Sequence, residues 1–166
     1  MYLTDILIEN VGPIERLDLQ LPFATNGTPR PAILVGANGS GKTVLLATIA
    51  DALILMAAPH FQDVVPQMGL GHAYFKILGG SNQRVHTSHA LALLGFEHSG
   101  VQASYVEKTG KLSHSTIAAA INLRFPGVSW PETENAKTFS GLNPDVVQAI
   151  CRASALCFWF FTDCSG

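Results

Sequence analysis

The chain has 166 residues, of which 48% are hydrophobic and 13% are charged, and its formal net charge is -2. The length suits one domain with its own core. The small net charge excludes an overall positive field that would attract nucleic acid, so a DNA contact needs a local patch or another chain. The N-terminus has no basic region and carries acidic residues at Asp5 and Glu9, unlike a secretory signal. The longest apolar stretch, residues 44–58, is shorter than the roughly 20 residues that cross a bilayer. We therefore expect a cytoplasmic protein with no membrane partner.

The first thirty residues predict two short strands joined by a turn. Residues 3–8 and 17–21 read as strands, and in the second segment leucines alternate with polar side chains, which is typical of strands. Gly12 and Pro13 between them supply the backbone angles of a turn. A polar loop, residues 24–31, follows the second strand.

A strand, a glycine-rich loop and a helix are expected next. The short apolar run 32–35 is of the kind found in a strand that is buried on both faces. The loop 36–41 ends that strand. From Lys42 onward apolar residues recur every three or four positions until Pro59, and this period predicts a helix.

The middle of the chain predicts an antiparallel element. Residues 72–78 resemble a strand, and the residues at 79–82, Gly-Gly-Ser-Asn, predict a turn. Residues 90–97 and 102–108 are two further strand-like runs, and the short segment 98–100 contains a glycine. This arrangement predicts a β-hairpin.

The C-terminal part is predicted to contain one helix. Residues 115–125 fit a helix or a strand, and residues 126–144 are rich in loop-forming residues. A helix is expected at 145–155, after an Asn-Pro start. The final run 156–161, Leu-Cys-Phe-Trp-Phe-Phe, is apolar enough to predict a buried strand or an interface.

The cysteines and histidines predict no metal site. Cys151, Cys157 and Cys164 have neither the spacing of a metal knuckle nor that of a disulfide framework, so free thiols are expected. His86 and His89 lie in a polar stretch without further candidate ligands, and we expect them to be solvated.

The strongest chemical signal is the sequence of residues 36–43. They match the pattern G-x-x-x-x-G-K-[ST] in full, after a predicted strand and at the start of a predicted helix. Such a loop binds phosphates because successive backbone N–H groups converge on a concave surface that side chains leave free. The predicted binding residues are Gly36, Ala37, Asn38, Gly39, Ser40, Gly41, Lys42, Thr43 and Val44.

Two side chains of the motif carry distinct chemistry. Lys42 is expected to bridge the β- and γ-phosphates, which gives it the catalytic role, and the hydroxyl of Thr43 is expected to be a ligand of Mg²⁺. The predicted ligands are therefore ATP and Mg²⁺.

The surrounding residues resemble the N-terminal lobe of the ABC-type ATPases of the SMC/RecF-like group. The resemblance rests on the pattern Ile8-x-Asn10-x-Gly12-x-Ile14 and on residues 33–43, Ile-Leu-Val-Gly-Ala-Asn-Gly-Ser-Gly-Lys-Thr. The hairpin region 96–110 is similar to the antiparallel subdomain of these proteins. The resemblance implies an α/β fold with a P-loop NTPase core, an antiparallel β subdomain beside it, and an incomplete lobe.

The resemblance also implies a domain organisation and a function. Residues 1–166 would form one lobe, with strands, Walker A motif and first helix in 1–58, the antiparallel subdomain in about 72–125, and a loop, a helix and an apolar run in 126–166. Two such heads, as a homodimer or with a complementary ATPase lobe, would clamp ATP between them. ATP binding and hydrolysis would then serve a DNA-related or defence function, with DNA reached through a larger assembly.

Several interpretations of the catalytic elements stay open. Residues 139–143, Phe-Ser-Gly-Leu-Asn, are a candidate signature motif, and Thr162-Asp163 is a candidate Walker B end with Cys164 at the position of the glutamate. We favour an N-terminal portion of a longer ATPase whose remaining elements are absent or supplied by another chain. The alternatives are a regulatory or assembly module that binds nucleotide without hydrolysis, and a small-molecule kinase, for which the sequence lacks an arginine-rich lid.

Overall fold

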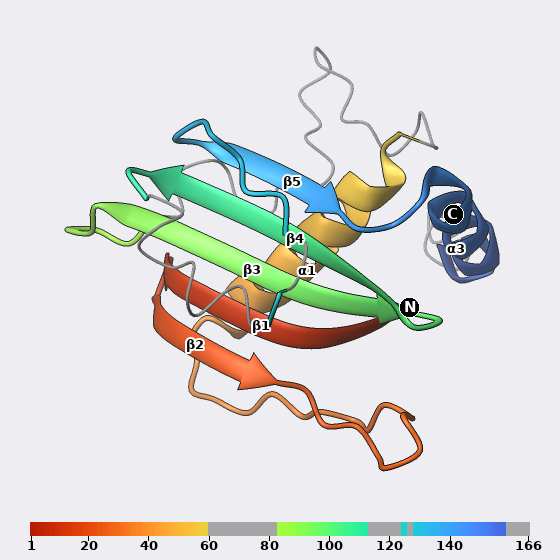
Figure 1. Ribbon diagram of the computed structural model, residues 1–166. Helices are drawn as coiled ribbons and strands as arrows, with labels where there is room; N and C mark the ends of the chain where they lie inside the picture. Colours follow the sequence, from red (N-terminus) through yellow and green to blue (C-terminus); the bar gives the residue numbers. More distant parts are fainter. Residues whose placement is uncertain (60–82, 113–123, 126–127, 159–166) are drawn as a thin grey trace, which may run out of the picture.

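A computed structural model describes residues 1–59, 83–112, 124–125 and 128–158. Its centre is one five-stranded sheet in the order β2-β1-β3-β4-β5, seen face-on in Figure 1. Every pair of neighbouring strands is antiparallel. The strands are β1 (Tyr2–Val11), β2 (Ile14–Gln20), β3 (His89–His98), β4 (Val101–Gly110) and β5 (Ala136–Ser140).

Two of the strand connections are tight turns that the sequence predicts. β1 and β2 pair from Asp5–Gln20 to Val11–Ile14, and Gly12 between them has a φ of 54°. β3 and β4 are joined by Ser99 and Gly100, which both have positive φ angles, as the two-residue turn of a twisted hairpin requires. The expected hairpins are therefore confirmed.

Side chains alternate between the two faces of the sheet along each strand, and each face contains a cluster of buried apolar residues. On one face, residues such as Ile6, Ile8 and Leu94 pack with Leu45 and Ala52 of the helix α1 (Lys42–Ala57). The other face has Leu7, Leu91, Leu93 and Val106 packed with Phe125. Figure 1 shows α1 crossing the sheet on a single side.

The second described helix, α3 (Pro144–Phe158), lies at one end of the sheet. Its start is capped, since the Asn143 Oδ1 atom accepts a hydrogen bond of 2.9 Å from the Asp145 N–H. Val147, Ile150 and Cys151 pack against Met56 near the end of α1. The helices predicted from Lys42 and over 145–155 are confirmed.

The expected α/β fold with a parallel P-loop NTPase core is wrong for this chain. The described residues form a small antiparallel five-stranded sheet with two short helices. Residues 32–35, predicted as a buried strand, pair with no strand in the described part of the chain, and Ile33 and Val35 are 86% and 90% exposed. A parallel strand needs a neighbour reached through a long crossover, whereas all four strand pairs here are antiparallel, and two of them, β1–β2 and β3–β4, are local hairpins.

Two smaller predictions are also corrected. The segment 126–144, expected to be loop, contains the edge strand β5. Residues 156–158 lie within α3, so the buried strand expected to begin there is wrong, whereas the alternative of an interface stays a prediction. The strand and turn predicted at 72–82, most of 115–125, and the residues from 159 onward lie outside the described residues. Within the described residues, no helix has the length and apolar character needed to span a bilayer.

Candidate phosphate-binding site

The predicted phosphate loop, residues 36–41, precedes α1 directly and is exposed except for Gly41. Gly41 is the N-cap of the helix and has a φ of 99°, which lies in the left-handed region. Gly39 has a φ of 81°. Since residues with a Cβ atom adopt such angles only at a cost, the backbone of this loop requires glycine at both positions.

At two positions of the loop, the lack of space for a Cβ atom is a further reason why the residue is glycine. A Cβ atom at Gly36 would lie 2.7 Å from the Ser40 Oγ atom. A Cβ atom at Gly41 would overlap Cγ1 of Ile14, on the first residue of β2. The loop is therefore folded closely on itself and on the β1–β2 turn.

The β1–β2 turn is a support for the loop that the sequence motif does not reveal. In addition to the Ile14 contact, a Cβ atom at Gly12 would lie 3.3 Å from Val44 Cγ2. Arg84 reinforces this turn, because its Nη1 donates to the Pro13 carbonyl at 3.3 Å. The signal in the sequence was the pair Gly12 and Pro13, which predicts a turn but not its contact with the loop.

The side chain of Lys42 turns back over the loop. Its Nζ atom donates hydrogen bonds to the carbonyl oxygens of Gly36 at 2.6 Å and Ala37 at 2.7 Å. The Ser40 N–H donates to the Ala37 carbonyl at 3.2 Å, which closes a turn inside the loop. The structure therefore brings the ammonium group predicted to bind phosphate to the mouth of the glycine loop.

The N-terminus of α1 offers unpaired N–H groups. The first bond within the helix joins the Leu45 N–H to the Gly41 carbonyl at 2.9 Å, so the amides of Lys42, Thr43 and Val44 have no acceptor inside the helix. No side chain caps this end, and its first turn contains no acidic residue. A helix end of this kind attracts anions through its N–H groups and its dipole.

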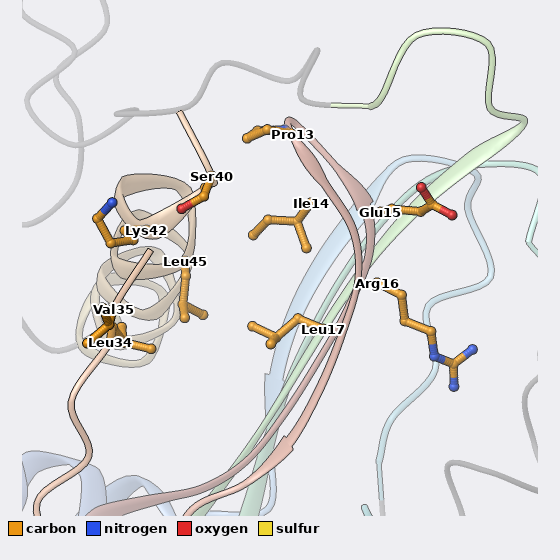
Figure 2. A pocket seen from close by; sticks show the side chains of 11 residues that line it. Pro13, Ile14, Glu15, Arg16, Leu17, Leu34, Val35, Ser40, Lys42 and Leu45 are labelled. Atoms are coloured by element: carbon orange, nitrogen blue, oxygen red, sulfur yellow. The ribbon is translucent and has the colours of Figure 1, made fainter. Parts of the chain in front are cut away.

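A pocket of about 320 Å³ is lined by residues of β2, of the segment 34–35 and of the start of α1. Figure 2 shows Ile14 and Leu17 pointing from β2 toward Leu45 of α1, whereas Glu15 and Arg16 point to the other side of the strand. Leu34, Val35 and Lys42 also line the pocket, together with Pro13, Ser40 and Gly41. The side of the pocket formed by Ile14, Leu17 and Leu45 is therefore apolar.

The described residues contain little that could bind Mg²⁺ through several side chains at once. Thr43 is exposed at the helix start, and the described residues contain no group of three or more histidine, cysteine, aspartate or glutamate side chains. Mg²⁺ commonly keeps several waters and is held by one or two protein oxygens plus substrate phosphates. A threonine hydroxyl beside a phosphate loop fits that mode of binding.

The other residues considered from the sequence lie away from this loop or form different contacts. Phe139 and Ser140 of the candidate signature end β5, and Gly141 to Asn143 lead into α3, while Thr162, Asp163 and Cys164 lie outside the described residues. His86 is exposed, and the His89 Nε2 atom is 3.8 Å from Glu9. Cys151 is a buried free thiol whose pKa is raised by burial.

No protein-family model and no curated protein matches the chain. The geometry of residues 36–44 and of the β1–β2 turn is therefore the basis for a functional proposal.

Proposed function

We propose that this chain binds a nucleoside triphosphate, ATP with Mg²⁺, through residues 36–44. The observation that carries the proposal is the position of Lys42, the first residue of α1: its ammonium group lies 2.6 and 2.7 Å from two carbonyls of the loop that precedes this uncapped helix N-terminus. A full positive charge and free backbone N–H groups at one place are suited to a polyphosphate.

The phosphates, the Mg²⁺ ion and the base of the nucleotide would each contact different residues. The amides of residues 42–44 and the Lys42 ammonium bind the phosphates, and Thr43 contributes its hydroxyl to the Mg²⁺ shell. The bound ion neutralises phosphate charge. The pocket wall formed by Leu17, Leu34 and Val35 supplies apolar surface for the base.

Two versions of the function differ in whether ATP is hydrolysed. Hydrolysis needs a group that orients the attacking water, and Glu15, the only carboxylate that lines the described pocket, points away from it. This observation favours the alternative of a nucleotide-binding regulatory or assembly module. An ATPase half-head that hydrolyses ATP with a complementary lobe, in a DNA-related or defence function, is the second candidate.

The binding proposal is tested by titrating the purified chain with a fluorescent ATP analogue and Mg²⁺. Lys42→Ala removes a charged donor, and hydrogen bonds to charged groups contribute roughly 1.5 to 3 kcal/mol, which corresponds to an affinity loss of about 10- to 150-fold. Lys111→Ala removes the same charge from an exposed position after β4 and is expected to leave the affinity unchanged. Equal affinities for the wild type and Lys42→Ala would refute the proposal.

Release of phosphate distinguishes the two versions. Turnover by the isolated chain that depends on Lys42 supports the ATPase half-head. Tight binding without turnover, also after a homodimer has been enforced by high protein concentration, supports the module that does not hydrolyse ATP.

A further inference from the structure

A cluster of charged side chains joins α1 to the far edge of the sheet. The Lys137 Nζ atom on β5 donates to Asp51 Oδ2 on α1 at 2.6 Å and lies 3.1 Å from Glu107 Oε1 on β4. Glu107 also accepts a hydrogen bond of 2.9 Å from the Tyr105 hydroxyl group. Only 13% of the Asp51 side chain and 31% of the Lys137 side chain are exposed.

The strand register places these groups together. Glu107 and Lys137 are direct cross-strand partners in the β4–β5 pair, and Tyr105 precedes Glu107 by two residues, so its side chain is on the same face. Tyr105 belongs to the apolar core under α1. The carboxylate of Asp51 therefore meets the cluster where the helix crosses the sheet.

The Lys137–Asp51 bond differs in kind from the other contacts of α1 with the sheet. The helix has only two charged residues, Lys42 at its first position and Asp51. Leu45 and Ala52 contact the sheet through apolar packing, which is non-directional, and the Thr48 hydroxyl bonds within the helix to the Val44 carbonyl. A bond between a charged donor and a charged acceptor has a defined length and direction, so it sets the position of the helix along its own axis.

The charge on Lys137 persists at neutral pH. Partial burial opposes the charge, but the hydrogen bond to Asp51 and the charge of Glu107 outweigh burial, so the pKa of Lys137 is raised. The ion pair is therefore formed under the conditions in which nucleotide binding would occur.

We propose that Lys137 is a positioning residue for the phosphate loop, acting through Asp51 and the body of α1. This inference rests on the proposed nucleotide binding. Asp51 follows Lys42 by nine positions, which is roughly 13 Å along the helix, and a helix transmits an axial shift over that length. Binding groups need to be held within about 0.5 Å of their productive geometry, so loss of the ion pair displaces the amides of residues 42–44 enough to weaken phosphate binding.

The experiment compares the affinity for Mg²⁺·ATP in three variants of the full chain. Lys137→Met keeps the length of the stem and removes the charge, and the expected loss of affinity is at least about fivefold, the lower range of coupling between sites. Lys137→Arg keeps the charge and is expected to restore the affinity to within about twofold, because it can bind the same carboxylate. Lys111→Met is the control for loss of one positive charge.

All affinities are measured without urea, under conditions in which circular dichroism shows that each variant is folded. If Lys137→Met does not fold, Asp51→Asn replaces it with the same expectation, because it keeps the shape of the side chain. A folded Lys137→Met that binds like the wild type overturns the inference, as does a Lys137→Arg variant that binds as weakly as Lys137→Met. In both cases the proposed function survives, whereas a wild type that does not bind Mg²⁺·ATP removes both proposals.

Discussion

Replacement of Gly41 by alanine tests how the phosphate loop is shaped. The φ of 99° at this position costs a residue with a Cβ atom roughly 1 to 2 kcal/mol. The new methyl group would also overlap Cγ1 of Ile14 and lie 3.0 Å from its Cδ1 atom, and such overpacking costs roughly 1 to 3 kcal/mol. The free energy of unfolding is therefore expected to fall by about 2 to 5 kcal/mol.

Gly39 is a matched control, because its replacement by alanine measures only the cost of the left-handed backbone angle. Its φ is 81°, and a Cβ atom there would have no neighbour within 4 Å. Gly39→Ala is expected to lose only the roughly 1 to 2 kcal/mol of the left-handed angle. The difference between the two variants measures the contact between the loop and the β1–β2 turn.

Urea unfolding followed by circular dichroism gives these free energies. A double-mutant cycle with Ile14→Ala isolates the contact further, because alanine lacks the Cγ1 and Cδ1 atoms that the new methyl group would meet. We expect a coupling energy of roughly 1 to 3 kcal/mol, in the range seen for residues in contact. Equal losses for Gly39→Ala and Gly41→Ala, together with no coupling, would show that Ile14 does not confine the loop.

Two further predictions concern the core. Burial, and then the charge of Glu107, raises the pKa of Tyr105 above its ordinary value, so the unfolded state loses this proton near pH 10 while the folded state keeps it. The contribution of Tyr105 to the free energy of unfolding is therefore fully present below pH 10 and falls above pH 10 by roughly 1.4 kcal/mol per pH unit. In urea titrations at several pH values, the Tyr105→Phe variant should lack this decrease. If the pH dependence is the same in the variant and the wild type, the assignment to Tyr105 is wrong. Leu94 on β3 is fully buried, so Leu94→Ala should reduce the free energy of unfolding by about 2 to 5 kcal/mol. Leu46, which is 57% exposed, serves as its control, with an expected change within about 0.5 kcal/mol for alanine; similar losses at both sites would refute the described packing of α1 on the sheet.

Local sequence signals predicted the elements whose cause is local. The turn at Gly12, the hairpin turn at Ser99 and Gly100, and the start of α3 after Asn143 are all confirmed. Each depends on backbone angles or capping within a few residues. The glycine and lysine pattern of residues 36–43 likewise predicted a loop at a helix N-terminus.

The predictions that failed concern pairing with distant residues. Residues 32–35 have the apolar composition of a strand, but a strand exists only beside a partner, and the structure places none next to them in its described part. β5 has the unremarkable sequence Ala-Lys-Thr-Phe-Ser, and it becomes a strand because it pairs with β4. Composition within either segment contains no information about that neighbour.

By itself, the sequence of this protein determined a glycine-rich loop with a lysine at the start of a helix, since glycine angles, helix period and turn residues act over short distances. Only the tertiary structure decided what surrounds that loop: an antiparallel sheet in place of a parallel core, the contact between Gly41 and Ile14, and the ion pair between Asp51 and Lys137. These contacts join residues that are 27 and 86 positions apart. The physical reason is that their free energy depends on which surfaces the folded chain brings together, and no local pattern specifies that choice.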